Sequence, residues 1–434
     1  MKQLTRLFIP ICLETLFYML SGMVDTLMLS AVGDYAVGAV GTANSYIGIF
    51  IIMFSIISSG MVSVMTQNIG AGRPGVAYQA RQLGLLFNAV AGVLMAVFLF
   101  SGAGAILRMV GIADALYEPA LIYLKIVGGG CILNAVIPIF SSYLRAFGYT
   151  KQPLYATVVG NIANFVMNAV FLFVLHKGVA GVATATVISK ILNLCIVLYF
   201  SHKLISAKNS TERIANKTVL GQIVKVGLPS ACETALYNVA MMLVIRFLNQ
   251  MDAEGLNVTA RSYTATISNF SYCVGAALAQ ANAIMTGWHI GAGELEECDR
   301  GTKQAAFVGV CVAVCMETAI VLGSGFIMPL FTDNPEMTAL VRKLLAIDIV
   351  LEIGRVTNLV FGQALKTSGD AVFPAVIAAV FMFVFAVGGT WLFGISMGLM
   401  AVGAYIGLAS DECVRAVGMV WRWKTGKWRT KKLV

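Results

Sequence analysis

Long apolar stretches recur along almost the whole chain, from Leu7 to Trp421, and they constrain the fold more than any other feature. The longest polar interval between them runs only from His202 to about Gln222. Only 12% of the residues are charged, whereas a soluble domain carries about 25%. Too few charged side chains are available to cover a water-facing surface. The sequence therefore predicts a polytopic membrane protein and excludes a secreted disulfide scaffold, a disordered chain and an ordinary cytosolic enzyme.

The apolar stretches predict an all-α membrane protein with twelve transmembrane helices. A span needs about 20 mostly apolar residues, and its backbone must satisfy its own hydrogen bonds in lipid, which favours helices over strands. The expected boundaries are residues 7–31, 38–66, 82–107, 116–145, 152–175, 178–202, 222–249, 256–288, 303–330, 337–366, 372–394 and 397–421.

The distribution of basic residues predicts the orientation of these spans. With the N-terminus placed inside, one set of loops and tails holds twenty of the 30 lysines and arginines, and the opposite set holds five. Cytoplasmic loops are the ones enriched in Lys and Arg, so both termini are expected in the cytoplasm of a multi-pass protein of the inner, or cytoplasmic, cell membrane. The first apolar run contains Glu14 and Asp25 and has no small-residue cleavage site, so we expect it to remain as the first span.

Three sequence matches relate the two halves of the chain. PICLETLFY from Pro10 matches PSACETALY from Pro229, with Glu, Thr and Tyr at the same offsets. MTQNIGAG then matches MTGWHIGAG, and YLRAFGYTKQP matches ALKTSGDAVFP, in the same order and at separations of about 219 to 221 residues. The matches predict a duplication of six helices, giving two pseudo-symmetric six-helix bundles in one membrane orientation.

The expected domain organisation follows from this duplication. The N-lobe covers residues 1–202 with the first six spans, and the C-lobe covers residues 222–421 with the last six. A polar cytoplasmic linker of residues 203–221 joins them, and a basic cytoplasmic tail of residues 422–434 follows.

Several of these motifs resemble one known family. Pro10 followed at fifteen residues by Asp25, in YMLSGMVDTLMLSAVG, is similar to the first helix of the multidrug and toxic compound extrusion (MATE) family. The loop QNIGAG, the turn LRAFGYTK and the runs GVAGVATATVIS and EIGRVTNLVFGQALKTSGDAVFP add to the resemblance, which covers nearly the whole chain. The resemblance implies a bacterial-type exporter of cationic or amphipathic organic compounds. Such an exporter is driven by inward movement of H+ or Na+ and alternates between outward-open and inward-open bundles.

Asp25 lies in the middle of the first span and is the first candidate for ion coupling. A charged side chain at that depth costs about 2.5 to 3.5 kcal/mol on insertion scales, so it needs a partner, a proton or a water-filled cavity. Glu14, Ser21 and Asp25 share one helix face because they are seven and four residues apart. Asp25 could bind a proton, exchange it for Na+, or release it when a cationic substrate arrives. The alternative is that it only caps or kinks the helix.

The fifth span adds amide side chains to this candidate site. Asn161, Asn164 and Asn168 lie there, and the last two share a face because they are four residues apart. In the family resemblance, Asp25, Asn164, Asn168 and Thr186 occupy the positions of the first-lobe cation or proton site, where many members have an acid in place of Asn168. The neutral residue leaves one formal charge, which weakens the case for tight Na+ binding and favours protonation of Asp25. Polar contact between helices is the alternative role for these asparagines.

The second half contains more charged residues within its spans than the first. Steps of three and four residues make ion pairs available between Glu352 and Arg355 and between Asp411 and Arg415, and we expect these to be structural.

Glu233 has no cation within one helical turn, so a partner must come from another span. It ranks second to Asp25, as an auxiliary acid or a substrate carboxylate. Lys190 lies in mid-span in the first half and joins Glu352 and Arg355 as part of a possible charge network.

The substrate surface needs aromatic lining with few fixed charges, because aromatic faces attract organic cations. Tyr18, Tyr46 and Tyr237 are weak candidates for this lining. The expected partners are the lipid bilayer and small organic substrates of cationic or amphipathic character. We expect no nucleic-acid partner and a monomeric protein.

Neither a metal site nor an enzyme active site is predicted. The nine cysteines and three histidines show no ligand spacing, and no GxSxG, Walker-type or HExxH motif is present. We therefore expect a secondary active transporter with no cofactor, for which H+ or Na+ is the coupling ion. Two alternatives are a flippase for lipid-linked precursors of a related fold, which needs a cationic cavity, and a membrane-embedded enzyme or ligand sensor without transport.

Overall fold

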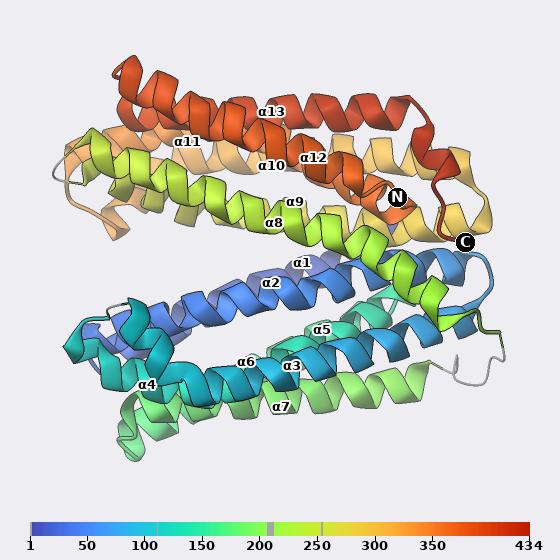
Figure 1. Ribbon diagram of the computed structural model, residues 1–434. Helices are drawn as coiled ribbons and strands as arrows, with labels where there is room; N and C mark the ends of the chain where they lie inside the picture. The colour runs from blue at the N-terminus through green and yellow to red at the C-terminus, as the bar shows by residue number, and fades with distance from the viewer. Residues whose placement is uncertain (1, 111, 206–211, 253–254) are drawn as a thin grey trace. The chain divides into compact units, whose positions relative to one another are not determined.

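The computed structural model describes residues 2–110, 112–205, 212–252 and 255–434, which are helical and contain no strand (Figure 1). The first half forms α1 (Lys2–Ser30), α2 (Asp34–Gly70), α3 (Pro74–Val110), α4 (Asp114–Gly129), α5 (Cys131–Ala146), α6 (Lys151–Ala169) and α7 (Gly178–Leu204). The second half forms α8 (Asn216–Met251), α9 (Leu256–Ala292), α10 (Leu295–Ile327), α11 (Pro335–Ser368), α12 (Val372–Phe381) and α13 (Met400–Lys424). The π-helices η1 (Val170–Val174), η4 (Met382–Val387) and η5 (Thr390–Ser396) extend α6 and α12.

These helices account for the twelve predicted spans. Eight are long and apolar enough to cross a membrane by themselves, and α4 with α5 makes a ninth, bent span. The other three spans are α9, α11 and α13, which carry more polar and charged side chains. Because α11 packs extensively against both α9 and α13, these polar faces are buried within the protein and do not face lipid. The predicted all-α fold of twelve spans is confirmed.

The fourth span differs from the continuous helix expected over residues 116–145. It bends by 42° between α4 and α5, after the glycine run 128–130. A side chain at Gly128 would meet the Cβ of Leu99 on α3 at 2.9 Å, so the glycine lets the two helices approach closely. The bend follows from the glycine run, because glycine resists bending least among the residues of a helix.

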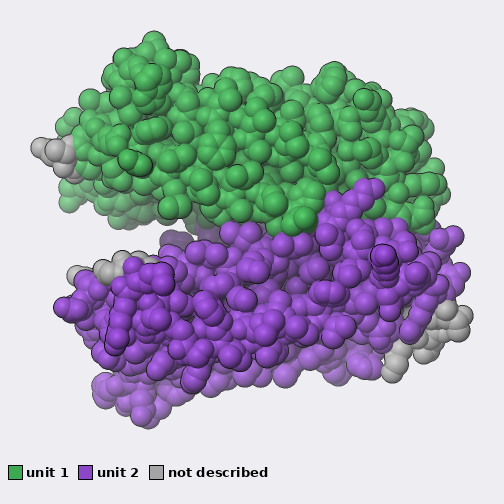
Figure 2. Space-filling view, viewed as in Figure 1, with its two compact units in different colours: residues 1–8, 228–434 green, residues 9–227 purple. Residues whose placement is uncertain are grey.

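The chain forms two compact units, an N-terminal unit of residues 9–227 and a C-terminal unit of residues 1–8 with 228–434 (Figure 2). The borders between them fall inside α1, after Phe8, and inside α8, after Gly227. Each unit buries its own apolar core, in which large residues such as Phe54 and Leu99, or Leu344 and Leu345, are at most 2% exposed. Many other core positions are alanines with no exposure, which lets helix backbones pack closely in lipid.

The duplication extends to the backbone. Pro10 and Pro229, which begin the first sequence match, lie inside α1 and α8. The fifth span of each half continues from an α-helix into a π-helix. A non-glycine residue with a φ of 49° then precedes or begins the sixth span, His176 in one half and Met400 in the other. Both halves therefore share these irregularities of the fifth and sixth spans as well as the same helix order.

The predicted linker of residues 203–221 lies partly outside the described residues, which omit 206–211. In its described part, α7 runs to Leu204 and α8 begins at Asn216. Gln79 on α3 holds the chain between them: its amide nitrogen donates to the Ile214 carbonyl at 2.7 Å and to Asn216 Oδ1 at 2.5 Å, and its oxygen accepts from the Ile214 N–H at 3.2 Å. The segment before α8 is thus fixed to the N-terminal unit.

The predicted basic tail folds back onto the C-terminal unit. Trp428 stacks on Trp423 with ring centroids 4.1 Å apart, and both indoles are 1% exposed. Arg422 and Lys431 pair with the buried Asp370 at 2.7 and 3.4 Å. The tail is therefore part of the packed structure.

The Asp252 side chain caps the start of α9. Its carboxylate accepts hydrogen bonds from the backbone N–H groups of Leu256 at 2.9 Å and Asn257 at 3.0 Å, and from the Asn257 side chain. Burial alone raises the pKa of Asp252, but these hydrogen bonds outweigh burial and hold the pKa below its usual value. Asn257 in turn accepts from the backbone N–H of Ala401 at 3.0 Å, which ties the start of α9 to the start of α13.

We predict that Asp252→Ala lowers the free energy of unfolding at pH 7 by about 1 kcal/mol, the usual cost of losing a helix cap. Because the folded-state pKa is lowered, this contribution is present above the unfolded pKa of about 3.9 and is lost as the pH falls through the folded value. Denaturation of the purified wild type and variant at pH 7 and at the lowest pH tolerated by both measures it. A difference in stability that does not shrink in acid would contradict the prediction.

Candidate functional site

The N-terminal unit brings Asp25 of α1 against Asn164 and Asn168 of α6. The Asn168 side-chain amide donates to Asp25 Oδ1 at 2.8 Å and to Asn164 Oδ1 at 3.1 Å. Asn168 is fully buried, Asn164 is 5% exposed and Asp25 is half-buried. Asn161 instead donates to the Phe17 carbonyl at 2.9 Å and fastens α6 to α1. Three of the four residues predicted for the cation site therefore lie together.

Thr186, the fourth predicted residue, is joined to this group through a tyrosine. The Thr186 hydroxyl donates to the Val182 carbonyl on its own helix, α7, at 2.9 Å. Its side chain also lies against Tyr123 of α4, which contacts Asn44 of α2 and interacts electrostatically with Asp25. Tyr123 and Asn44 are polar neighbours of the site that the sequence did not indicate, since they lie on spans remote from Asp25 along the chain.

A buried lysine lies near the same group. Lys190 of α7 donates to Asn134 Oδ1 of α5 at 2.8 Å and interacts electrostatically with Asp25. No ion pair joins Lys190 to Asp25 within the described part of the chain. Glu352 and Arg355, the other members of the possible charge network, lie in the C-terminal unit. Lys190 therefore belongs to the surroundings of Asp25.

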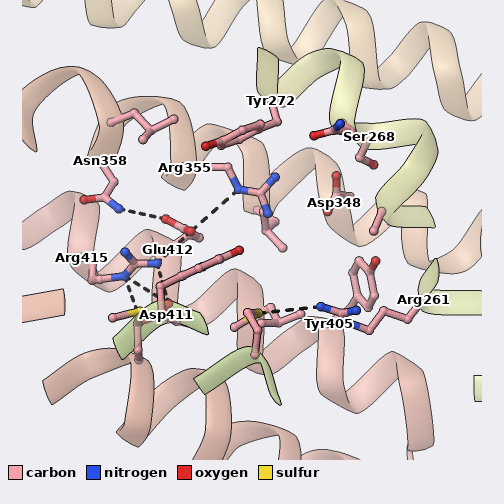
Figure 3. A pocket seen from close by; sticks show the side chains of 18 of the residues that line it. Arg261, Ser268, Tyr272, Asp348, Arg355, Asn358, Tyr405, Asp411, Glu412 and Arg415 are labelled. Carbon is pink, nitrogen blue, oxygen red and sulfur yellow. Dashed lines mark hydrogen bonds and ion pairs between the residues drawn. The ribbon is translucent and has the colours of Figure 1, made fainter. Parts of the chain in front are cut away.

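The C-terminal unit contains a cavity of about 410 Å³, lined by side chains of α8, α9, α11, α13 and η4 (Figure 3). This volume is in the range of small-molecule sites, about 300 to 1,000 Å³. The aromatic lining is Tyr237, Tyr272 and Tyr405. The charged lining residues are Glu233, Arg261, Asp348, Arg355, Asp411, Glu412 and Arg415.

Most charges around this cavity neutralise one another. Arg415 pairs with Asp411 at 2.7 Å and with Glu412 at 2.8 Å, all on α13. Arg355 on α11 contacts Glu352 one turn earlier and approaches Glu412 at 3.8 Å. Both ion pairs expected from the sequence spacing are present in the structure. Glu412 joins them into one network across α11 and α13, as Figure 3 shows.

Arg261 is held differently from the other two arginines of the cavity. Its guanidinium donates to the sulfur of Met241 at 3.8 Å, and a thioether is a weak acceptor. It also lies near Tyr405, and it forms no ion pair with any described residue. Asn358, which donates to Glu412 Oε2 at 3.0 Å, is a further polar lining residue. Asn358 and Tyr405 carry no charge and were not predicted from the sequence, although Asn358 lies within the run EIGRVTNLVFGQALKTSGDAVFP.

Comparison with known proteins identifies the family to which this chain belongs. The MatE family profile matches the chain twice, over residues 10–170 and 229–392. The chain belongs to the MatE family. The two matches begin 219 residues apart, at the two prolines of the first internal sequence match, which confirms the predicted duplication.

Relatives and solved structures agree with this assignment. The chain is 32% identical over 428 residues to "Uncharacterized transporter YisQ" of Bacillus subtilis (strain 168), covering 97% of this chain and 94% of the relative. It is 21% identical over 446 residues to "Probable multidrug resistance protein NorM" of Thermotoga maritima, covering 100% and 94%. Its fold is similar to "Crystal structure of MATE in the bent conformation", with a TM-score of 0.86, 20% identity and coverage of 99% and 96%. The resemblance to the MATE family is confirmed, and the protein is a multi-pass membrane transporter.

Each unit of this MatE transporter has an ion pair at the same place in the repeat. Glu14 of α1 pairs with Arg145 of α5 at 2.6 Å, and Thr157 of α6 donates to the same Glu14 oxygen at 3.4 Å. Glu233 of α8 pairs with Lys366 of α11 at 2.7 Å. The four charged side chains are 12% to 21% exposed. Glu233, predicted as an auxiliary acid, thus lines the cavity with its carboxylate already engaged by Lys366.

The three tyrosines proposed for substrate lining have different surroundings. Tyr237 is 39% exposed and lines the cavity of the C-terminal unit. Tyr46 packs against the apolar core of the N-terminal unit. Tyr18 is 72% exposed. Of the three, Tyr237 is the one at the described cavity.

We predict that Arg145→Met lowers the free energy of unfolding by about 2 kcal/mol, less than the 3 to 5 kcal/mol of a fully buried broken pair, because both partners keep some exposure. Arg145→Lys reproduces the glutamate–lysine pair of the other unit and should lose less than half as much. Lys366→Met and Lys366→Arg form the corresponding set in the C-terminal unit. Chemical denaturation of the purified variants compares them, and an equal loss for Arg145→Lys and Arg145→Met would show that charge pairing does not stabilise this contact.

Proposed function

We propose that this MatE protein is a proton-coupled antiporter that exports cationic or amphipathic organic compounds across the cytoplasmic membrane. The observation that carries the proposal is Asp25, an acid in the middle of the apolar helix α1 that accepts a hydrogen bond from the neutral amide of Asn168. An acid in such a position needs a proton or a cation to become neutral. The relative described as a probable multidrug resistance protein supports the substrate class.

Asp25 can serve two ligands in turn because its charge is only partly compensated. Asn168 donates to Oδ1, and Lys190 acts from beyond ion-pair distance. A proton taken up from the outside neutralises the carboxyl and weakens its hold on a cationic substrate. Release of that proton to the inside restores the negative charge, which attracts the next cationic substrate. Competition for one charge thereby couples inward proton movement to outward export.

The membrane potential supplies energy to any exchange that moves net charge across the membrane. Moving one elementary charge down about 100 mV yields about 2.3 kcal/mol, which corresponds to a concentration ratio of roughly 50. A proton gradient adds to this value. Exchange of one proton for one singly charged substrate is electrically neutral, so the pH gradient alone drives it. Exchange of a proton for a neutral amphipathic substrate moves net charge, so the membrane potential and the pH gradient both drive it.

The geometry around Asn168 favours H+ over Na+ as the coupling ion. Its amide nitrogen lies between Asp25 Oδ1 and Asn164 Oδ1, the two oxygens that a metal cation would need. Binding Na+ there requires the amide to turn so that its oxygen faces the cation. Binding a proton requires only the other oxygen of Asp25. The absence of a second acid at position 168 points the same way, because one carboxylate attracts Na+ less than two.

The charges of the C-terminal cavity favour export of organic compounds over flipping of lipid-linked precursors. A pyrophosphate head group needs several free cations. Arg355 and Arg415 are held by carboxylates, and Arg261 alone among the described arginines of the cavity has no ion pair. We also propose that both termini lie in the cytoplasm, in line with the basic residues of the predicted cytoplasmic loops, and that the protein works as a monomer.

We predict that Asp25→Asn abolishes proton-driven uptake of a fluorescent organic cation into inside-out proteoliposomes. The asparagine keeps the size of the side chain and removes its exchangeable charge. Asp114→Asn, at the exposed start of α4, is the matched control and should transport like the wild type. Transport driven by a pH gradient that persists in Asp25→Asn would reject Asp25 as the coupling residue.

We predict that Asn168→Asp makes transport depend on Na+. The second carboxylate doubles the negative charge of the site and removes the bridging amide nitrogen. In proteoliposomes with the pH gradient collapsed, an inward Na+ gradient should drive dye movement at least several-fold faster in Asn168→Asp than in the wild type. Na+-driven transport of equal rate in both proteins would instead show that the wild-type site already uses Na+.

A further inference from the structure

One face of α9 runs along the cavity of the C-terminal unit. The α9 residues that line the cavity are Arg261, Ala265, Ser268, Asn269 and Tyr272. The steps between them are three or four residues, apart from the adjacent Ser268 and Asn269, so they share one side of the helix. From Arg261 to Tyr272 this face is about 16 Å long at 1.5 Å per residue. The cavity wall therefore carries an arginine at one end of the face and a tyrosine at the other.

The guanidinium of Arg261 is poorly paired for a charged group on a cavity wall. Among the described residues, it donates to the sulfur of Met241 at 3.8 Å and forms no ion pair. A thioether is a weak acceptor, and a guanidinium has five N–H donors. Arg355 and Arg415 each contact a carboxylate. Figure 3 shows Arg261 on the side of the cavity away from the network around Glu412, so its donors are available to a ligand.

The carboxylates of the cavity are engaged elsewhere. Three of the four described acids in its lining already contact a basic side chain, namely Glu233, Asp411 and Glu412. The fourth, Asp348, lies against Ser268 and beyond ion-pair distance of Arg261. No described acid therefore neutralises Arg261 at close range, and an anionic group of a ligand could do so.

The remaining lining determines what else such a ligand must carry. The apolar lining side chains include Met241, Leu351, Leu359, Met382 and Leu408, and two tyrosines face the same space. These groups favour an apolar or aromatic body. A guanidinium fork matches the two oxygens of one carboxylate through parallel N–H···O bonds. An amphipathic carboxylate therefore fits the cavity better than an inorganic anion, which would leave the apolar lining uncovered.

The duplication indicates that Arg261 is not part of the shared scaffold. At the separation of 220 residues that relates Met65 to Met285, Arg261 corresponds to Gly41 of α2. The ion pair of Glu233, by contrast, has a counterpart in the other unit. An arginine that occurs in one unit only, on the wall of that unit's cavity, is better explained by a ligand of the cavity than by the packing of the repeat.

We propose that Arg261 binds the carboxylate of an amphipathic organic substrate and is the residue that selects such substrates for the C-terminal cavity. The carboxylate takes the N–H donors that Met241 leaves unused, and the apolar body of the substrate packs against the tyrosines and aliphatic side chains. The inference names a substrate class for the proposed exporter and in that respect rests on the proposed function.

Equilibrium binding to the purified full-length protein tests this assignment. The two probes are a rhodamine with a free carboxylate and its methyl ester, a cation with the same ring system. We expect the wild type to bind the carboxylate probe more tightly than the ester, by about tenfold, as hydrogen bonds to a charged group would give. Fluorescence polarisation measures both affinities and needs no ion gradient.

Three variants assign the preference to Arg261. Arg261→Gln should weaken binding of the carboxylate probe by about tenfold or more and should bind the ester more tightly than the wild type does, because a repelling charge is gone. Arg261→Lys keeps the charge without the guanidinium fork and should lose less. Arg246→Gln, an exposed arginine of α8 outside the cavity lining, is the matched control and should keep the wild-type ratio of affinities. The melting temperature of each variant shows that it is folded.

Two results would overturn the proposal. One is a ratio of the two affinities that stays unchanged in Arg261→Gln. The other is an equal loss of both probes in folded Arg261→Gln, since the arginine would then not discriminate between them. Proton-driven transport is a separate measurement. A wild type that shows the expected preference but moves neither probe in a pH gradient would contradict the proposed export and leave the binding role of Arg261 standing.

Discussion

The cost of placing charge inside a membrane governs the arrangement of this protein. A charged side chain within a span needs a partner, a proton or a water-filled cavity, since lipid offers no compensation. The spans with the most charge and polarity, α9, α11 and α13, are too polar to pass as membrane helices by themselves. They are accommodated because α11 packs on both of the others and brings Arg355 near Glu412 of α13, where Arg415 pairs with Asp411 and Glu412. Charge compensation therefore decides which helices occupy the interior of the C-terminal unit.

The two units show what a duplication keeps and what it changes. The glutamate four residues after the proline of α1 and of α8 pairs with a basic residue at the equivalent end of α5 or α11. The interiors differ. The N-terminal unit has Asp25 with amides and a lysine, whereas the C-terminal unit has a network of acids and arginines around a cavity. The shared contacts fix the scaffold, and the differing interiors allow each unit a separate chemical task.

The sequence predicted much of the fold and only part of the candidate site. Asn164 and Asn168 were placed together by their spacing on one helix, and Arg415 was matched to Asp411 for the same reason. The fourth span was expected to be continuous, but the glycine run before Cys131 bends it. The partners of Asp25 on other helices, Tyr123 among them, could not be predicted, because hydrophobic periodicity does not say which helix faces which.

By itself, the sequence determined the membrane class, the twelve helical spans, the duplication and the pairs of charges that share a helix face. These properties depend on residue type and on the fixed period of the helix, which are local. Only the tertiary structure decided that Lys366 meets Glu233, that Lys190 meets Asn134, and that Glu317 approaches two acids of α11. Such contacts join residues far apart in the chain. They are set by how whole helices pack, which depends on the shapes of many side chains at once.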